Sequence, residues 1–452
     1  MKKMKHDVPT RLVKVLILIL MMVAFGFVWY GYYAARAQVH YYRRGDWVVI
    51  LLFGILYYGF CRSYDAFHIS ISPISEIIYS QTLALIISDF IMYVVIWLLS
   101  LYMPNAVPLL ITFGVQFLIS VLWTFLAHQW YFHNFQPERT AVIYDLREGM
   151  ESLVGEYGME KKFHIEKVLG VEECLAKLSV LDEMDTVFLS GIHSHERNII
   201  LKYCMYQDIQ VYVIPRIGDV IMGGAKKVHM FHLPMLRIDR YRPIPEYTIA
   251  KRAFDILFSG IAIVIASPFM LVTAIAIKSD GGPALYKQKR LTKDGKEFNV
   301  LKFRSMRVDA EKDGVACLST GDKDDRITPV GKIIRKIRFD ELPQLFNILR
   351  GDMSIVGPRP ERPEIARQYE EEMPEFRLRL QAKAGLTGYA QVYGKYNTTP
   401  YDKLLMDLTY IGTPSLWEDF KICLATVKIL FMPESTEGVA EGATTAMGGE
   451  KH

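Results

Sequence analysis

The chain contains the stretch Arg338-Phe339-Asp340-Glu341-Leu342-Pro343-Gln344, in which two adjacent carboxylates precede a helical pattern. Asp340 is a good N-cap residue, and Pro343 is tolerated only in the first turn of a helix. Apolar residues then recur at helical spacing until Gly351: Leu342, Leu345, Phe346 and Leu349. We therefore expect the two acids at a helix N-terminus, where exposed N–H groups favour anions and lower the pKa of a carboxylate.

Taken alone, the acid pair is more simply explained as an N-cap and a first-turn charge. The surrounding cations favour a different interpretation: Lys302, Arg304, Arg326, Arg335, Lys336, Arg350, Arg359 and Arg362. They alternate with rigid Gly and Pro turns, as a preorganised phosphate site requires, and Arg359 lies between two prolines. The sequence therefore predicts a site for a phosphorylated ligand. An ionised Asp340 could act there as a nucleophile, and Glu341, on a different face of the helix, would have another role.

Hydrophobic residues make up 51% of the 452-residue chain, so a membrane portion is expected. Apolar runs occur at about 15–33, 47–61, 82–102 and 106–127. The second run is short and could either span a thinned bilayer or lie at the interface. Basic residues before the first run favour a cytoplasmic N-terminus, although arginines in the first loop oppose it. We expect residues 1–135 to form a transmembrane four-helix bundle, in which Asp89 faces inward in a structural role.

Residues 136–245 have the pattern of a Rossmann-like α/β domain, with strands expected at 140–144, 186–190 and 211–215. The first strand is followed by Asp145-Leu146-Arg147-Glu148-Gly149 instead of a G-x-G-x-x-G fingerprint. A structural, dimerising or regulatory domain is therefore favoured over one that binds NAD. We interpret Gly218, Gly223 and Gly224 as turn residues.

A further apolar run covers 256–277 and contains Ser267-Pro268 at its centre. Pro268 cannot donate to the carbonyl of Val264, so it should kink the helix there. The residues alone leave two alternatives, a kinked transmembrane helix or a re-entrant helix-break-helix over 250–278. Basic residues at both ends suit anchors at one headgroup layer.

Several ordered motifs give the chain a resemblance to the bacterial sugar transferases, the polyprenyl-phosphate hexose-1-phosphate transferases of the large monotopic type. They are Lys251-Arg252-Ala253-Phe254-Asp255, Ser267-Pro268, Lys302-Phe303-Arg304, the acid pair, Gly357-Pro358-Arg359-Pro360, Gly385-Leu386-Thr387-Gly388 and Ala390-Gln391-Val392. The resemblance implies a mostly helical monotopic catalytic domain over 246–433, and it favours the re-entrant alternative. Such a helix would hold Asp340 near the bilayer surface.

This resemblance also implies a mechanism. Asp340 would attack the β-phosphate of a UDP-sugar and release UMP, and undecaprenyl phosphate would then accept the sugar-phosphate. Mg²⁺ would be the cofactor, with Glu341 and Asp340 as candidate ligands. Arg335 would clamp a phosphate, Arg359 would hold the departing nucleotide, and the remaining candidate substrate contacts are Lys302, Arg304 and Arg326. The stretch Lys383-Ala384-Gly385 departs from the family's usual Arg-Pro-Gly.

The resemblance suggests UDP-glucose or UDP-galactose as donor, membrane lipid as a partner, and a multi-pass protein of the bacterial inner membrane with its catalytic domain on the cytoplasmic face. It implies the first membrane step of exopolysaccharide, capsule or O-antigen synthesis. A homodimer is left open. The net charge of +4 is too small to indicate nucleic acid, and the polar tail 434–452 is expected to be disordered. The rival functions are a catalytically silent membrane scaffold or sensor and a membrane-bound UDP-sugar dehydratase.

Overall fold

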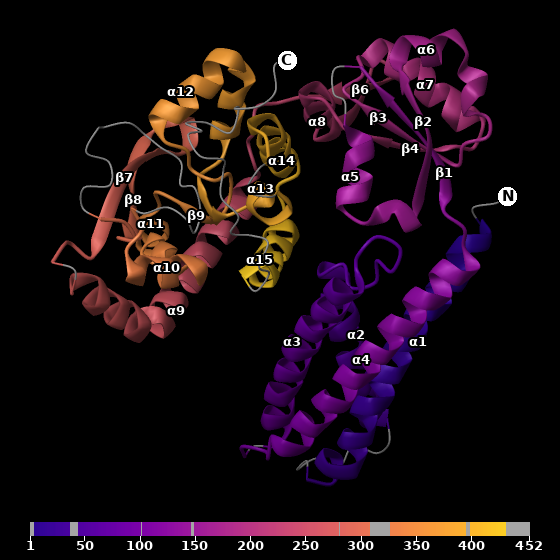
Figure 1. The fold of residues 1–452 in the computed structure, drawn as a ribbon. Coiled ribbons are helices and arrows are strands. Elements are labelled where there is room, and N and C mark those ends of the chain that lie inside the picture. Colours follow the sequence, from indigo (N-terminus) through magenta and orange to yellow (C-terminus); the bar gives the residue numbers. More distant parts are fainter. Residues whose placement is uncertain are drawn as a thin grey trace. The chain divides into compact units, whose positions relative to one another are not determined.

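The computed structural model describes residues 4–36, 44–100, 102–145, 149–279, 281–307, 326–394 and 398–430 (Figure 1). The predicted tail at 434–452 lies outside these residues. Contacts divide the chain into two compact units, Met1–Ile214 and Pro215–His452. The sequence analysis put the boundary of the catalytic domain near residue 245. The division by contacts falls earlier, because α8 (Ile217–Gly223) packs against α14 (Pro400–Gly412) in the second unit.

Four long apolar helices begin the first unit: α1 (Met4–Val28), α2 (Arg44–Ser63), α3 (Ile74–Ser100) and α4 (Val107–Asn134). A π-helix (Trp29–Tyr33) and a 3-10 turn (Ala34–Arg36) continue α1. Each helix packs against its neighbours in the order α1, α2, α3, α4, and α4 also contacts α1. All four, together with α9 of the second unit, are long and apolar enough to cross a membrane. The chain is therefore a membrane-associated protein.

The α/β part of the first unit is a parallel sheet in the order β2-β1-β3-β4. Its strands are β1 (Glu138–Tyr144), β2 (Phe163–Gly170), β3 (Thr186–Ser190) and β4 (Gln210–Val213). Buried residues of β3 alternate between two cores: Val187 and Leu189 join one with α6 (Val171–Ala176) and α7 (Ser194–Tyr206), and Phe188 joins the other with α5 (Met150–Glu156). The predicted α/β unit is confirmed, with β2 as a strand that the sequence analysis did not identify.

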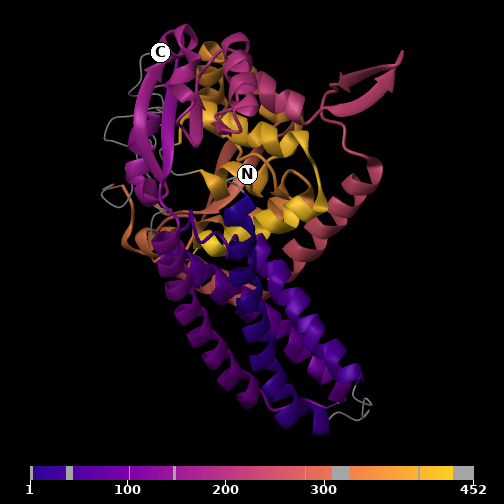
Figure 2. The ribbon, with the colours of Figure 1, turned by 90° about the vertical axis from the view of Figure 1, so that its right-hand side faces the viewer.

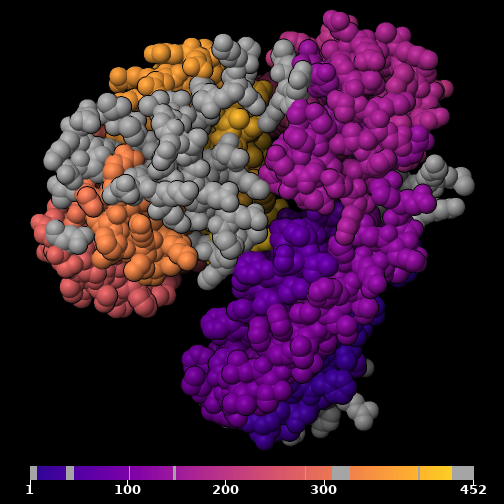
Figure 3. Space-filling model, viewed as in Figure 1, coloured from indigo at the N-terminus to yellow at the C-terminus, as the bar shows by residue number. Residues whose placement is uncertain are grey.

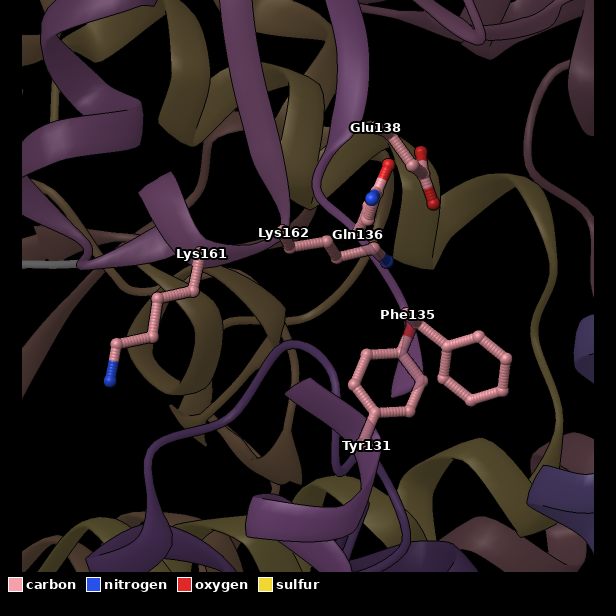
Figure 4. Close-up of a pocket in the computed structure, with 6 residues that line it drawn as sticks. All are labelled: Tyr131, Phe135, Gln136, Glu138, Lys161 and Lys162. Atoms are coloured by element: carbon pink, nitrogen blue, oxygen red, sulfur yellow. The ribbon is translucent and has the colours of Figure 1, made fainter. Parts of the chain in front are cut away.

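A small hollow lies where α4 runs into β1 (Figure 4). It is lined by Tyr131, Phe135, Gln136, Glu138, Lys161 and Lys162. Because Glu138 begins β1, the hollow is at the amino end of the sheet, whereas open α/β sheets bind ligands at the carboxyl ends of their strands. It gives no support to a nucleotide site in this unit.

The second unit is mostly helical and contains three two-stranded sheets. Its remaining elements are β5 (Lys226–Met230), β6 (Leu233–Arg237), α9 (Pro245–Lys278), β7 (Leu285–Leu291), β8 (Glu297–Phe303), α10 (Pro329–Lys336), α11 (Gln344–Arg350), β9 (Ser354–Val356), α12 (Pro363–Glu372), β10 (Gly385–Thr387), α13 (Tyr389–Tyr393) and α15 (Leu416–Leu430). Strands β5–β6 and β7–β8 pair antiparallel, and β9 pairs with β10 in parallel. The β5–β6 hairpin stands clear of the other elements of this unit (Figure 2).

Helix α9 is a single helix of 34 residues with Pro268 inside it. The Ser267 hydroxyl donates to the Val264 carbonyl at 2.8 Å, so the acceptor that Pro268 leaves without its helical partner is satisfied locally. The helix therefore continues through Ser267-Pro268, and it changes direction along its length (Figure 1).

Two glycines allow α8 and α14 to approach closely. Gly218, Gly223 and Gly224 were predicted to be turn residues, which is wrong for Gly218 and Gly223, because both lie within α8. Gly224 lies in the turn that follows α8, and a Cβ atom on it would meet the Gly412 Cα at 2.8 Å. We expect Gly224→Ala to separate the two helices and to lower the stability of the second unit by about 1–3 kcal/mol, the usual cost of overpacking. Thermal unfolding of the purified chain would measure the change.

The matched control is Gly223→Ala, because a Cβ on that neighbouring residue meets nothing within 4 Å. It should leave the melting temperature unchanged or slightly raised. Equal melting temperatures for the two alanine variants would contradict this account of the α8–α14 contact.

Candidate active site

Asp340 and Glu341 lie in a 3-10 turn (Phe339–Glu341) between α10 and α11. Arg338 precedes the turn in the left-handed conformation, with φ of 53°. Helix α11 begins only at Gln344, so the expectation that Asp340 caps this helix is wrong. The left-handed Arg338 ends the segment that follows α10 in a tight turn, and the two acids lie in this turn.

Glu341 is held by two cations from different parts of the second unit. Lys302, at the end of β8, donates to Glu341 Oε1 at 3.0 Å, and Arg359 Nη2 contacts the same oxygen at 2.9 Å. Burial opposes ionisation of this carboxyl, whose side chain is 14% exposed, but the charges of Lys302 and Arg359 outweigh it. The pKa of Glu341 is therefore lowered well below its ordinary value.

Asp340 has the opposite electrostatic environment. It forms no ion pair with the residues that the structure describes. Burial, and then the negative charge of Glu341, raise its pKa to about 6, despite the opposing charges of Lys302, Arg335 and Arg359. The expected lowering of this pKa by a helix N-terminus is therefore wrong, because removal from water dominates. Glu341 therefore stays ionised between two cations. Asp340 is partly buried and has no ion-pair partner among the described residues.

The structure brings together three of the predicted cationic site residues, Lys302, Arg335 and Arg359, around the acid pair. Arg335 lies in the last turn of α10, and its buried Nη1 atom has no hydrogen-bond partner in the part of the chain that the structure describes. An unsatisfied buried cationic donor is costly unless a ligand completes it. Arg335 is therefore suited to bind an anion.

Two other predicted residues have different surroundings. The Arg304 guanidinium is buried and donates to the carbonyls of Pro283 and Ile277, at 2.9 and 3.1 Å. It fixes the end of α9 and is not joined to the acid pair. Arg326 lies beside the bridge between Met306 and Ile327, and its carbonyl accepts from the Arg307 N–H at 2.9 Å.

Arg359 is supported by residues that the sequence analysis missed. Arg379 Nη2 donates to the Arg359 carbonyl at 2.8 Å, and Arg290 Nη1 donates to the Pro360 carbonyl at 3.1 Å. The buried Asp407 accepts from Arg379 Nε at 2.8 Å. These partners are separated from one another by 20 to 70 residues along the chain, so no local pattern identifies them.

Helix α9 contacts α11 and β9, the segments on either side of the site. In the space-filling view the red and the orange parts of the second unit adjoin each other (Figure 3). Asp255 accepts from Ser354 Oγ at 3.1 Å and from the Ile355 N–H at 2.9 Å, shortly before the Arg359 loop. Arg252 donates to the carbonyls of Ile348 and Leu349, both at 2.7 Å, in the last turn of α11. The motif over residues 251–255 thus has a positional role, because it ties the membrane helix to α11 and β9.

The raised pKa of Asp340 leads to a prediction about stability. The folded-state value of about 6 exceeds the ordinary value of 3.8, so folding strengthens proton binding at this carboxyl. The resulting destabilisation is absent below pH about 4 and fully present above pH about 6. Asp340→Asn should therefore raise the melting temperature at pH 7.5 by a few degrees and have a clearly smaller effect at pH 4.5.

Thermal unfolding of the purified chain at a series of pH values would check this. Glu372→Gln changes an exposed carboxyl on α12 and serves as the control. A benefit of Asp340→Asn that is equal at both pH values would show that burial of this charge is not its cause.

Comparison with known proteins identifies relatives of the second unit. Residues 246–433 match the family described as bacterial sugar transferase. The chain is 39% identical over 234 residues to a UDP-N-acetylgalactosamine-undecaprenyl-phosphate N-acetylgalactosaminephosphotransferase of Aeromonas hydrophila, covering 51% of this chain and 54% of that protein. It therefore spans about half the length of this relative.

Two further relatives are covered more completely. A UDP-glucose:undecaprenyl-phosphate glucose-1-phosphate transferase of Caulobacter vibrioides is 41% identical over 201 residues, 43% of this chain and 74% of that protein. A putative undecaprenyl-phosphate N-acetylgalactosaminyl 1-phosphate transferase of Bacillus subtilis is 47% identical over 136 residues, 30% of this chain and 75% of that protein. Together with the match over 246–433, these similarities show that the chain belongs to the bacterial sugar transferase family.

Proposed function

We propose that this protein transfers a hexose-1-phosphate from a UDP-sugar to undecaprenyl phosphate, at the first membrane step of exopolysaccharide, capsule or O-antigen synthesis. The observation that carries the proposal is the division within the acid pair: Lys302 and Arg359 both bind Glu341 Oε1, while Asp340 has no ion-pair partner among the described residues. A carboxylate without a fixed partner, next to cations, is available as a nucleophile toward a phosphate.

In the first step an Asp340 carboxylate oxygen attacks the β-phosphorus of the UDP-sugar. The bond between that phosphorus and the oxygen bridging to the α-phosphate breaks, and UMP leaves with the bridging oxygen. The sugar-phosphate is then esterified to Asp340. The arrangement supports this step, because Arg335 has a buried unpartnered Nη1 for a phosphate oxygen and Arg359 is anchored through its carbonyl.

In the second step a phosphate oxygen of undecaprenyl phosphate attacks the same phosphorus and displaces the Asp340 carboxylate. The product is an undecaprenyl-diphosphate sugar, and the enzyme returns to its starting state. Both phosphoryl transfers use the same cations, because UMP and the lipid phosphate in turn occupy the position opposite Asp340. No external base is needed, since both nucleophiles are anions.

The oxygen ligands present fit Mg²⁺. Glu341 Oε1 is occupied by two cations, but its second carboxylate oxygen and the Asp340 carboxylate are oxygen donors of the kind this ion prefers. Within the described residues no cluster of three His, Cys, Asp or Glu side chains could hold a metal alone. Substrate phosphates would have to complete the coordination. When bound, Mg²⁺ would neutralise charge on the diphosphate.

The catalytic unit is proposed to lie on the cytoplasmic face of the inner membrane, and α1 to α4 are proposed to cross that membrane four times. The contacts of α9 support a re-entrant rather than a spanning helix. Its first half is tied to α11 and β9 through Arg252 and Asp255, while Ile277 near its end packs with Phe303 and Ile334 of the same unit. Between these attachments its apolar side chains are exposed: Ile261, Val264, Ile265, Phe269, Leu271 and Val272.

The donor is expected to be UDP-glucose or UDP-galactose, and the relatives' names add UDP-N-acetylgalactosamine to the sugars worth testing. Membranes containing the protein would be incubated with radiolabelled undecaprenyl phosphate and each of these UDP-sugars. The wild-type chain should form a lipid product and UMP with at least one of them.

Asp340→Asn should lower this transfer at least about 10⁴-fold and abolish the trapped phosphosugar adduct, because an amide cannot replace the carboxylate as nucleophile. Glu341→Gln should retain the nucleophile but release Lys302 and Arg359, so a weaker loss is expected. Detection of the protein-bound phosphosugar by mass spectrometry, with a UDP-sugar present and undecaprenyl phosphate left out, measures the first step alone. Unchanged turnover in Asp340→Asn would leave the protein as a membrane scaffold or sensor.

The re-entrant arrangement predicts that both ends of α9 face the cytoplasm. In a cysteine-free background, Glu246→Cys and Ser279→Cys should each react with a membrane-impermeant maleimide in inside-out vesicles and not in right-side-out vesicles. Asn105→Cys, between α3 and α4, is the control and should react in right-side-out vesicles only. Opposite labelling of Glu246→Cys and Ser279→Cys would mean that α9 spans the bilayer.

A further inference from the structure

Gln391 has a buried carboxamide, and among the described residues neither its nitrogen nor its oxygen has a hydrogen-bond partner. It lies in the short helix α13, and the rest of the residue is partly exposed. By contrast, the nearby Gln381 uses both ends of its carboxamide: Nε2 donates to the Leu378 carbonyl at 2.9 Å, and Oε1 accepts from the Tyr241 N–H at 3.0 Å. A buried amide that makes neither bond lowers the stability of the fold. A bound ligand that forms these two hydrogen bonds would explain its presence.

The carboxamide lies against the loop that carries Arg359. A Cβ atom on Gly388 would lie 2.7 Å from Gln391 Oε1 and 2.1 Å from the Gly357 carbonyl oxygen. Both oxygens therefore lie directly beside Gly388. The absence of a side chain at Gly388 is what permits this approach. Gly357 is two residues from Arg359, and two residues span at most about 7 Å. The carboxamide therefore lies close to the backbone of the loop whose Arg359 guanidinium binds Glu341.

The two unsatisfied atoms define the chemistry of the missing group. Phosphate oxygens only accept hydrogen bonds, so a phosphate would satisfy Nε2 and leave Oε1 unpaired. A complete match requires a neutral edge with one donor and one acceptor side by side. In a nucleotide sugar, such an edge is offered by the imide of uracil and by the hydroxyl groups of the ribose or the hexose.

We infer that Gln391 binds a neutral donor–acceptor edge of the nucleotide sugar, and so helps to select the donor substrate. This inference rests on the proposed function, because it takes the nucleotide sugar as the ligand of the Arg359 loop. Arg335 and Arg359 would bind the charged part of the donor, and Gln391 would bind an uncharged part. The bound ligand would supply the hydrogen bonds that the Gln391 carboxamide lacks in the ligand-free protein.

The test compares Gln391→Leu with Gln381→Leu in the full-length chain. Leucine has a similar size but no polar atoms, so Gln391→Leu should raise the melting temperature of the ligand-free protein, whereas Gln381→Leu should lower it. Nucleotide affinity should respond in the opposite sense. Loss of two hydrogen bonds predicts a dissociation constant raised about 10- to 100-fold in Gln391→Leu, and unchanged within about twofold in Gln381→Leu.

The ligands used distinguish the possible edges. Calorimetric titrations would use UMP and CMP with the otherwise wild-type chain, and UDP-glucose, UDP-galactose or UDP-N-acetylgalactosamine in an Asp340→Asn background to prevent turnover. Weakening of UMP but not CMP assigns the base edge, and equal weakening of both assigns the ribose. Weakening of a UDP-sugar alone assigns the hexose.

The inference is overturned if Gln391→Leu binds UMP and the UDP-sugars as tightly as the wild-type chain does. If the leucine variant does not fold, Gln391→Glu takes its place. Glutamate keeps the size and the hydrogen-bond acceptor of the side chain but removes its donor, so this variant should also bind the nucleotide more weakly. Failure of the proposed function would look different, since the wild-type chain would then bind neither UMP nor any UDP-sugar.

Discussion

One oxygen atom, Oε1 of Glu341, accepts from both Lys302 and Arg359. These residues come from a strand and from a proline-rich loop that are far apart in the sequence, so the shared acceptor fixes three segments at one point. Removing one of these charges leaves the largely buried Glu341 less well compensated, which destabilises the fold, although the exposure of Arg359 to water limits the loss. The raised pKa of Asp340 has burial as its main cause, and the negative charge of the ionised Glu341 beside it adds to the shift.

The supporting structure extends outward from that cluster in two directions. Arg379 and Asp407 form a buried pair that holds the main chain of the Arg359 loop, and Asp255 holds the strand leading into it. Both supports act on backbone atoms and leave the Arg359 side chain free to reach the acid pair. The unit therefore fixes the position of its charges mainly through the backbone, which suits a site whose electrostatic arrangement must be formed before the substrate binds.

The sequence predicted those features that depend on local pattern. The apolar helices, strands β1, β3 and β4, and the importance of Asp340, Glu341, Lys302, Arg335 and Arg359 follow from composition, periodicity and ordered motifs. Strand β2 was missed, because His164, Glu166 and Lys167 place polar residues along an edge of the sheet. The capping role of Asp340 was wrong, since the left-handed Arg338 stops the chain from entering α11 directly. Arg304, Arg379 and Asp407 could not be assigned from sequence, because their partners are distant along the chain.

The Ser267-Pro268 pair has a consequence for the membrane. A proline in a helix normally exposes a carbonyl that water must solvate, and hydrocarbon offers no water. Here the Ser267 hydroxyl donates a hydrogen bond to the Val264 carbonyl, so this carbonyl needs no water molecule. In the re-entrant arrangement proposed for α9, the chain could therefore bend within the hydrocarbon layer without drawing water into it.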